Sequence, residues 1–152
     1  MAEETYFYDT FYALQWAGLN LNTQTVKVLL VTSDYTFDAS HESMAEILTS
    51  PSPEVAQVDS PSNGYTTGGK TLTGTGISVS ASPKMTVFEA DDVEWNPLTA
   101  TFRGAIYYID GEVDGITDPP LFYLMPDNTP ADVVISGTNY KLEHSAGVMT
   151  SA

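Results

Sequence analysis

The sequence of 152 residues contains no cysteine, few basic side chains and no long apolar run. The absence of cysteine excludes disulfide bonds and fits assembly in a reducing cytoplasm. The longest unbroken apolar runs, Ala105–Ile109 and Leu121–Met125, have about five residues, whereas a membrane-spanning helix needs about 20. The opening residues MAEETYFYD have neither the basic nor the apolar segment of a signal peptide. We therefore expect a soluble protein that is not exported and does not enter a membrane.

Acidic side chains dominate the charge of the protein. Twenty Asp and Glu residues stand against five Lys and Arg, so the net charge is −15. The basic residues are scattered, and none of them forms a run. Such a surface repels phosphate backbones and anionic membranes, so nucleic acid is not an expected partner. Most of the carboxylates are expected to keep an apolar-rich protein soluble.

Short runs of β-branched and aromatic residues predict an all-β domain. The chain length suits a single β domain over residues 1–152. Short strands separated by Gly, Pro and Asn turns favour an antiparallel β-sandwich or barrel, jelly-roll-like, with one or two short helices. The expected strands are Thr23–Thr32, Thr71–Thr73, Ile77–Ala81, Met85–Ala90, Ala100–Ile109, Leu121–Met125, Asp132–Ile135 and Tyr140–His144, and a further short one can form at Val93–Trp95.

The segment Met85–Asp110 is expected to organise the rest of the chain. Its two main strands are separated by a turn at Asn96-Pro97. The second strand carries bulky residues on both faces, so we expect it to be central and covered on both sides: Phe102, Ile106 and Tyr108 lie on one face, and Arg103, Tyr107 and Ile109 on the other. In contrast, Ile77–Ala81 alternates apolar residues with serine, which is typical of a half-exposed strand. Near the end of the chain, Gly137-Thr138-Asn139 is expected to join two strands.

Residues 1–18 form an aromatic N-terminal arm. Asp9 is expected to cap a short helix that runs through Ala17, with Gly18 just after its end. Apolar side chains surround this helix, so one core face cannot absorb them all. We predict that the arm is an interface with a partner or between copies of the protein, through Tyr6, Phe7, Tyr8, Phe11, Tyr12 and Trp16. The alternative is that the arm closes the end of its own domain. A second helix is expected over Ser40–Leu48, capped by Ser40.

The segment Gly64–Thr71 satisfies the pattern GxxxxGK[ST] of a phosphate-binding loop. That chemistry needs a buried strand before the loop and a helix after it, so that helix amides face the phosphates. The preceding residues DSPSN and the following residues LTGTGISVSAS supply neither. We therefore interpret the segment as a glycine-rich turn and expect no nucleotide and no other cofactor.

The segment from Asp110 imitates the first half of a calcium-binding loop through Asp110, Glu112 and Asp114. The twelfth position would be Leu121, where a bidentate Glu is required. A hairpin loop in solvent is the expected structure, and calcium remains a weak candidate. No other metal site is expected.

Catalytic patterns are sparse, and we do not expect an enzyme. His41 and His144 lie far apart in the chain, and no serine or cysteine nucleophile motif is present. The carboxylates Glu89, Asp91 and Asp92 could hydrolyse a glycoside, but a nearby pair is expected by chance among so many acids. We expect Asp91 and Asp92 to accept hydrogen bonds from turn amides instead.

Several segments together resemble small virion proteins of tailed bacteriophages. The segments TVKVLLVTSDYTFD, NGYTTGGKTL, VFEADDVEW with ATFRGAIYYID, and PLFYL follow one another in the order typical of that family. The resemblance spans about Asp9 to Val148. Lys70 departs from the family's turn. The matching residues are Gly64, Tyr65, Gly68 and Gly69 in the turn, and Asp91, Asp92 and Trp95 in the acidic segment.

The resemblance implies a structural protein of the virion. The first expectation is a head decoration (cement) protein that binds the major capsid protein on the capsid exterior, stabilises it, and is assembled in the host cytoplasm. An acidic surface suits the exterior better than the DNA-filled interior. A homo-oligomer is expected, with a trimer first because capsids offer three-fold positions. The alternatives are a tail- or fibre-associated protein that contacts host glycan, or a carbohydrate-binding module with Trp95, Tyr107 and Tyr108 as aromatic platforms.

Overall fold

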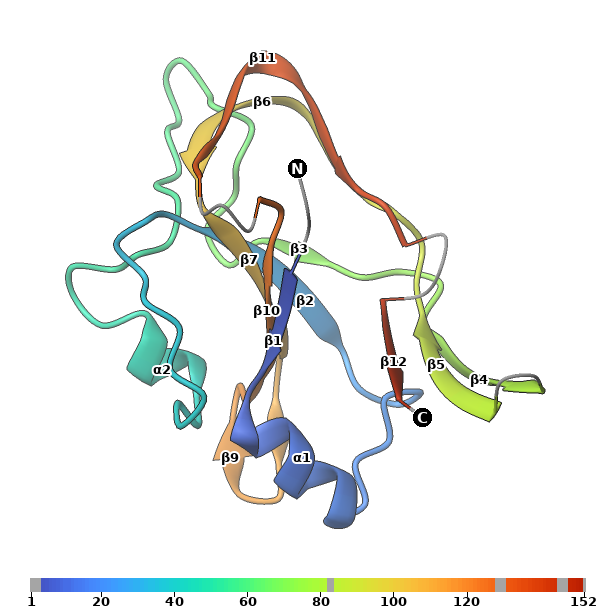
Figure 1. Cartoon of the computed structure of the whole chain (residues 1–152). Coiled ribbons are helices and arrows are strands. Elements are labelled where there is room, and N and C mark those ends of the chain that lie inside the picture. The colour runs from blue at the N-terminus through green and yellow to red at the C-terminus, as the bar shows by residue number, and fades with distance from the viewer. Residues whose placement is uncertain (1–3, 82–83, 128–130, 145–147, 152) are drawn as a thin grey trace.

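A computed structural model of the chain has a five-stranded antiparallel sheet at its centre (Figure 1). The structure describes residues 4–81, 84–127, 131–144 and 148–151. Strands make up 46% of it and two short helices 9%, which confirms the predicted all-β, sandwich-like class with antiparallel sheets. Among the described residues, no helix is long and apolar enough to cross a membrane.

The strands form four sheets that hydrogen-bond separately. The central sheet has the order β1-β10-β7-β2-β3, and the others pair β11 with β6, β12 with β5 and β4, and β8 with β9. The elements are β1 (Glu4–Phe7), α1 (Asp9–Trp16), β2 (Val26–Val31), α2 (Met44–Ile47), β3 (Lys70–Thr71), β4 (Gly76–Ala81), β5 (Lys84–Glu89), β6 (Val93–Phe102), β7 (Gly104–Ile109), β8 (Glu112–Val113), β9 (Ile116–Thr117), β10 (Pro120–Met125), β11 (Val133–Leu142) and β12 (Met149–Ser151).

Strand β7 lies in the middle of the central sheet and is buried on both faces, as predicted for Ala100–Ile109. The predicted strand is divided, however: residues 100–102 belong to β6, and Phe102 packs in the cluster of Tyr107 instead of with Ile106 and Tyr108. Strand β7 pairs antiparallel with β2 from Val26↔Ile109 to Val31↔Gly104, and with β10 on its other side. Alternate residues of β7 belong to different core clusters: Tyr107 packs on one face of the sheet and Tyr108 on the other. Gly104 is required here, because a Cβ atom would stand 2.2 Å from the ring of Tyr123.

Different elements cover the two faces of this sheet. The long curved ribbon of β6 and β11 packs over one face through Trp95, Leu98 and Phe102, which are fully buried (Figure 1). Helix α2 and the chain before it cover the other face, with Met44 and Ile47 at the predicted helical spacing.

The N-cap of α2 lies three residues after the predicted one. Ser43, and not Ser40, is the N-cap, and its hydroxyl accepts a hydrogen bond from the amide of Glu46. The Ser40 hydroxyl donates instead to Asp38, because the chain before the helix folds into a turn of its own.

Two predicted turns are absent from the β6–β11 ribbon. Strand β6 runs without a break through Asn96-Pro97, and β11 runs through Gly137-Thr138-Asn139. The two segments face each other, where the pairing shifts register from Thr138↔Leu98 to Tyr140↔Trp95. Residues that favour turns also suit bulges, and a bulge accommodates a proline that has no amide hydrogen to donate.

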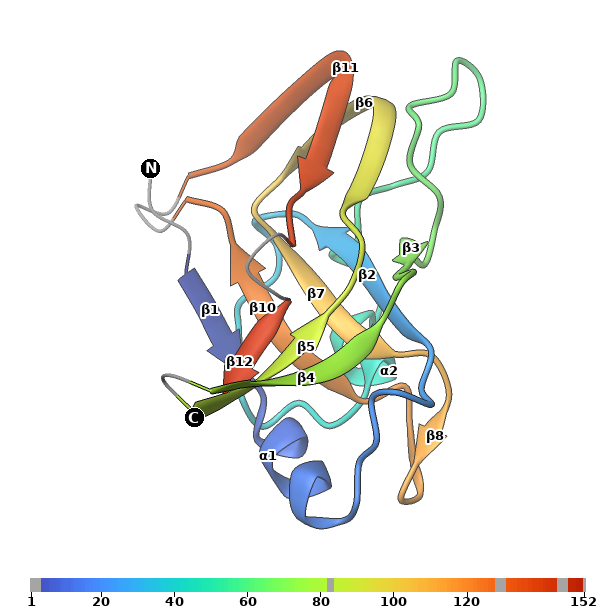
Figure 2. The ribbon, with the colours of Figure 1, turned by 90° about the vertical axis from the view of Figure 1, so that its right-hand side faces the viewer.

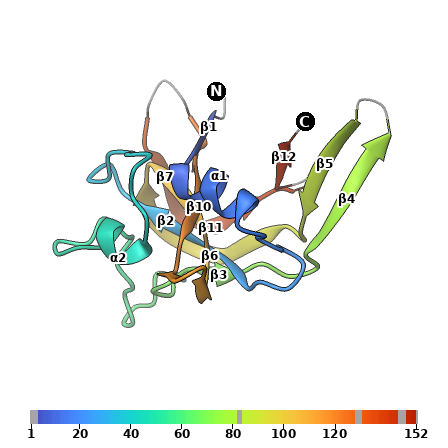
Figure 3. The same ribbon diagram turned by 90° about the horizontal axis from the view of Figure 1, so that it is seen from below.

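Strands β4, β5 and β12 form an arm sheet that projects away from the body (Figures 2 and 3). The arm sheet is attached to the body near its base, where the side chain of Phe88 is buried and the carbonyl of Phe88 accepts a hydrogen bond from the amide of Val148. The sequence pattern predicts a half-exposed strand at Ile77–Ala81, but its apolar residues Ile77 and Val79 are themselves exposed, because no further layer among the described residues covers the arm sheet at that point. The predicted turn at Ser82-Pro83 lies outside the described residues.

Candidate interaction surface

Helix α1 presents opposite faces to the core and to solvent. It begins at Asp9 after Tyr8, so Asp9 is not the predicted cap; Tyr8 is the N-cap and makes no side-chain cap bond. Helix α1 ends at Trp16, one residue before the predicted Ala17, which is the C-cap. The predicted glycine after the helix is confirmed: Gly18 has φ +91, and the amide of Leu19 donates to the carbonyl of Leu14. Phe11 and Leu14 face the core.

The aromatic arm is only partly available for an interface. Tyr8 and Phe11 lie in the core, which corrects the prediction that their side chains meet a partner. Tyr6 and Phe7 are half-buried, and Phe7 packs on Phe122 of its own chain at a ring distance of 5.8 Å. These four residues close the end of their own domain. The other two project into solvent: Tyr12 is 53% exposed and Trp16 is 94% exposed.

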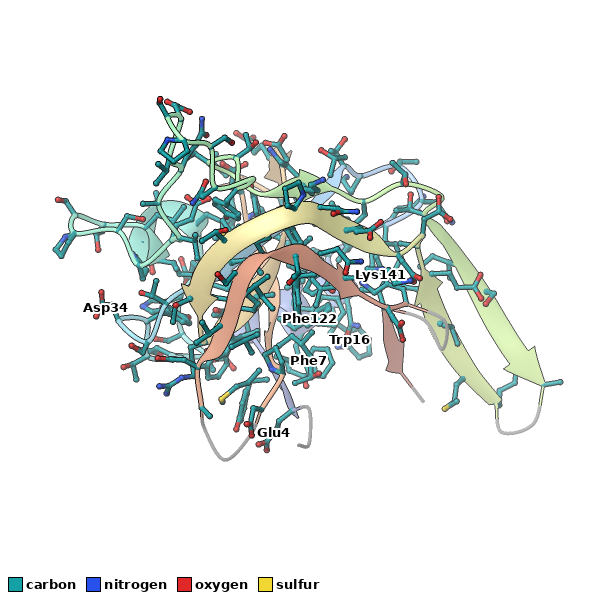
Figure 4. All side chains as sticks on the ribbon, turned by 90° about the horizontal axis from the view of Figure 1, so that it is seen from above. Glu4, Phe7, Trp16, Asp34, Phe122 and Lys141 are labelled. Atoms are coloured by element: carbon teal, nitrogen blue, oxygen red, sulfur yellow. The ribbon has the colours of Figure 1, made fainter. Side chains whose placement is uncertain are left out.

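A pocket of about 400 Å³ separates α1 from the base of the arm sheet. We call it the α1 groove. Figure 4 shows Phe7 and Trp16 on the side of the body that faces the arm. None of the lining residues is charged, although the chain carries a net charge of −15. The groove is lined by Phe7, Phe11, Tyr12, Gln15, Leu19, Asn20, Leu21, Asn22, Ile77, Thr86 and Phe88.

The exposed apolar side chains concentrate around this groove. Among the described residues, six large apolar side chains are exposed, and four of them are on α1 or β4. Tyr12 and Trp16 are one helical turn apart on α1, and Ile77 and Val79 share one side of β4. Exposed apolar side chains are ordinary when scattered, but a cluster beside a pocket marks a place where a partner binds. The remaining two are Val58 and Val134.

The glycine-rich turn is occupied by a carboxylate of the same chain. Glu54 Oε1 accepts hydrogen bonds from the amide of Gly68 (2.6 Å) and from the hydroxyl of Tyr65 (2.7 Å). Burial, together with the adjacent Glu54 charge, raises the pKa of Tyr65. The loop leads into strand β3 and not into a helix, and Lys70 Nζ donates to the carbonyl of Glu94 at 2.7 Å. The amide that would face a phosphate therefore faces Glu54.

The residues of the turn that carry the family resemblance allow it to pack closely against neighbouring strands. A Cβ atom on Gly69 would stand 1.9 Å from the carbonyl oxygen of Val28, and one on Gly64 would stand 1.9 Å from that of Pro97. Both glycines have positive φ, which side chains rarely tolerate. The turn is thereby pressed against β2 and β6. Tyr65 stacks on Trp95, with ring centroids 6.4 Å apart.

The acidic segment is joined to the end of β11 through His144. Asp92 Oδ1 accepts from the amide of His144 at 2.6 Å, and His144 Nδ1 lies 2.8 Å from the carbonyl oxygen of Asp91. The ring of His144 is buried, and its Nε2 lies 2.8 Å from the Tyr107 hydroxyl. Neither contact is the predicted bond to an amide of the local turn: Asp92 accepts from an amide that follows β11, and the Asp91 carboxylate accepts from the hydroxyl of Thr73.

The aromatic platforms considered for glycan are part of the core. Trp95 is fully buried, and Tyr107 and Tyr108 are 1% and 6% exposed. None of them offers a face to a sugar, so this version of the carbohydrate prediction is wrong. His41 lies near Tyr35 on the opposite face of the sheet from His144, and the two histidines do not form a site.

The calcium candidate is a tight hairpin. Asp114 and Gly115 have positive φ and join β8 to β9, and the amide of Gly111 is held by Asp118 Oδ1 at 2.8 Å. No group of three or more His, Asp or Glu side chains within the described part of the chain could hold a metal ion. The three predicted ligands, Asp110, Glu112 and Asp114, therefore belong to a hairpin loop.

Comparison of the chain with known protein families, curated proteins and solved structures found no match. The assignment of function therefore depends on the chemistry of the molecule's own surfaces. Among these surfaces, the α1 groove combines a formed pocket, a lining without charged residues and the exposed ring of Tyr12, and Trp16 is exposed one helical turn further along α1.

Proposed function

We propose that the protein is a structural protein of a bacteriophage virion, namely a head decoration protein that binds the outside of the capsid and stabilises it. The observation that carries this proposal is the α1 groove, an uncharged aromatic surface on a strongly acidic domain. The groove is the surface that a partner such as the major capsid protein would cover. The acidic remainder suits the exterior of a capsid, away from packed DNA. The resemblance to small virion proteins supports the same role.

The exposed aromatic side chains give this surface its binding energy. A large aromatic residue buries up to about 250 Å², which at about 25 cal/mol per Å² corresponds to about 6 kcal/mol for Trp16 when it is fully covered. Loss of translational freedom and ordering of side chains on association offset part of this gain. Trp16 at 94% exposure is therefore the expected hot spot of the interface, and Tyr12 supports it.

Binding of the purified protein to capsids that lack it tests the proposal. We expect Trp16→Ala to abolish or strongly weaken decoration and Trp16→Phe to retain most of it. Val134→Ala is the control, because Val134 is 69% exposed but lies on β11, whereas Trp16 lies on α1, the helix that borders the groove. Since Trp16 makes no part of the core, all three variants should remain folded. Full occupancy by the Trp16→Ala variant would refute the proposal.

The copy number of the protein in purified particles distinguishes a head decoration protein from a tail or fibre component. A decoration protein covers the capsid lattice and is present in many copies, whereas a tail or fibre component is present in few. Labelling of the particle surface shows the same difference directly, by uniform label over the head or label at the tail alone.

A saccharide is the second candidate for the groove. Side-chain amides of Gln15, Asn20 and Asn22 lie beside Tyr12 in an uncharged pocket, and amides with aromatic rings are the groups that bind neutral sugars. Binding of a neutral oligosaccharide near α1 would change the fluorescence of Trp16, while Trp95 stays buried. A saccharide-dependent signal that is lost in Trp16→Phe would favour the tail or fibre role.

A further inference from the structure

Strand β4 presents an edge that is open to pairing. It is the outer strand of the arm sheet, because among the described residues only β5 pairs with it. Natural proteins protect such edges with charged side chains, prolines or bulges. The sequence of β4, GISVSA, has no charged residue and no proline, and its pairing with β5 is regular over all six residues. Ile77 and Val79 are exposed on it, so an apolar row accompanies the open edge.

One contact shows which backbone groups point outward. The amide of Ile77 donates to Asn22 Oδ1 at 3.0 Å, away from β5. Backbone groups alternate in direction along a strand, so the amides and carbonyls of Val79 and Ala81 also point away from β5. Asn22 covers the beginning of the edge, and no described strand other than β5 pairs with the part from Val79 to Ala81.

We propose that this edge pairs with the same edge of a second copy of the chain, antiparallel and centred on Val79. In this register Val79 faces Val79 of the other copy, and Ile77 faces Ala81. The apolar residues Ile77, Val79 and Ala81 of the two strands then lie on one side, so the edge is complementary to itself. The outward groups of Val79 form two equivalent hydrogen bonds across the axis, and the ladder ends there because the amide of Ile77 stays bonded to Asn22.

The charge distribution favours a second copy over another partner at this edge. Two chains with a net charge of −15 repel each other over most of their surfaces. Strand β4 is a place where they can approach without bringing like charges opposite each other. The two-fold arrangement is closed, so it gives a dimer and not a fibre, and it differs from the trimer expected from capsid symmetry. Ile77 and Asn22 belong both to this edge and to the lining of the α1 groove, so the second copy lies beside the groove, while Tyr12 and Trp16 on α1 are not part of the paired edge.

A single introduced cysteine tests the register. The natural chain has no cysteine, so Val79→Cys can form a disulfide only between copies. Residues that face each other in a hydrogen-bonded antiparallel pair have Cα atoms about 5.5 Å apart, within the range that a disulfide bridges. We expect rapid and nearly complete cross-linking of Val79→Cys under mild oxidation. The control is Val134→Cys, because Val134 is at least as exposed as Val79 (69% against 59%) but lies on β11. Equal cross-linking rates for the two variants would overturn the proposal.

Sedimentation of the intact chain measures the association itself. We expect a monomer–dimer equilibrium that tightens as salt is added, because salt screens the repulsion between acidic copies. Val79→Pro removes an outward amide and spares the β4–β5 bonds, so it should weaken the dimer at least about tenfold. Val79→Lys is a second test that does not depend on whether the proline variant folds. It places a charge on the edge, as natural proteins do to prevent pairing, so it should also weaken the dimer. A protein that is monomeric up to about 1 mM, or a folded Val79→Lys variant that dimerises normally, would overturn the proposal.

This outcome is independent of the proposed function. Trp16→Ala should lose capsid binding and keep the dimer, whereas Val79→Lys should lose the dimer and keep the α1 groove intact. Failure of either proposal can therefore be recognised without reference to the other.

Discussion

Removal of the Glu54 carboxylate tests whether this side chain stabilises the glycine-rich turn. Its Oε1 atom accepts from the Gly68 amide and from the Tyr65 hydroxyl, and it has no substitute on the turn. Hydrogen bonds to a charged group contribute about 1.5–3 kcal/mol, and a buried donor that loses its acceptor costs about 1–3 kcal/mol. We expect Glu54→Ala to lower the free energy of unfolding by about 3 kcal/mol. Glu54→Gln keeps an acceptor oxygen without the charge, so we expect a loss of about 1 kcal/mol.

A double-mutant cycle isolates the contact between the two side chains. Tyr65→Phe removes the donor to Glu54 and also the acceptor for the amide of Leu30, so it should cost about 2 kcal/mol alone. The double variant should be less destabilised than the sum, with a coupling energy of about 1 kcal/mol.

Urea unfolding followed by circular dichroism gives the four free energies of the cycle. The control is Glu112→Ala, at an exposed carboxylate of the β8–β9 hairpin, which should change stability by less than about 0.5 kcal/mol. If Glu54→Ala behaves like this control, the carboxylate does not hold the turn.

Three further predictions concern the backbone, the tyrosines and the core. Gly69→Ala should destabilise by several kcal/mol or prevent folding, because its Cβ would stand 1.9 Å from a β2 carbonyl; Gly76→Ala, with open space, is the control in the same urea assay. Burial raises the pKa of Tyr123 to about 12, above the value of about 10 in an unfolded chain. The contribution of Tyr123 to stability should therefore be fully present below pH 10 and be lost as the pH rises toward 12, as measured by urea unfolding from about pH 9 to 12 and by tyrosinate absorbance. Phe102→Ala should cost about 3–5 kcal/mol, since the ring is fully buried under the β6–β11 ribbon; a loss of a few tenths would show that the ribbon is not part of the core.

The sequence was most informative where burial is complete. Bulk on both faces of Ala100–Ile109 predicted a central strand, and β7 is buried on both faces because the ribbon and α2 cover it. The same reasoning failed at Asn96-Pro97 and at Gly137-Thr138-Asn139. Turn residues and bulge residues are the same types, and the choice between them depends on a pairing partner about forty residues away, which no local pattern contains.

The candidate surface was predicted in outline but not in detail. An excess of aromatic residues in the first turns of the chain pointed to an interface, yet burial of Tyr8 and Phe11 depends on packing against β10 and α2. Only tertiary contacts distinguish these residues from Trp16. Glu54 had no signal at all, because the turn that it holds begins ten residues further along the chain.

The order of strands in the central sheet also governs how the chain reaches its fold during synthesis. Strand β2 needs residues 104–109 as a partner, and β1 needs residues 122–125. The apolar segment VKVLLV therefore leaves the ribosome long before the strand that will cover its main edge exists. Throughout that interval the unpaired strand is open to association with other nascent chains. The many carboxylates carried by the same chain, which repel neighbouring copies, protect it until β7 has been made.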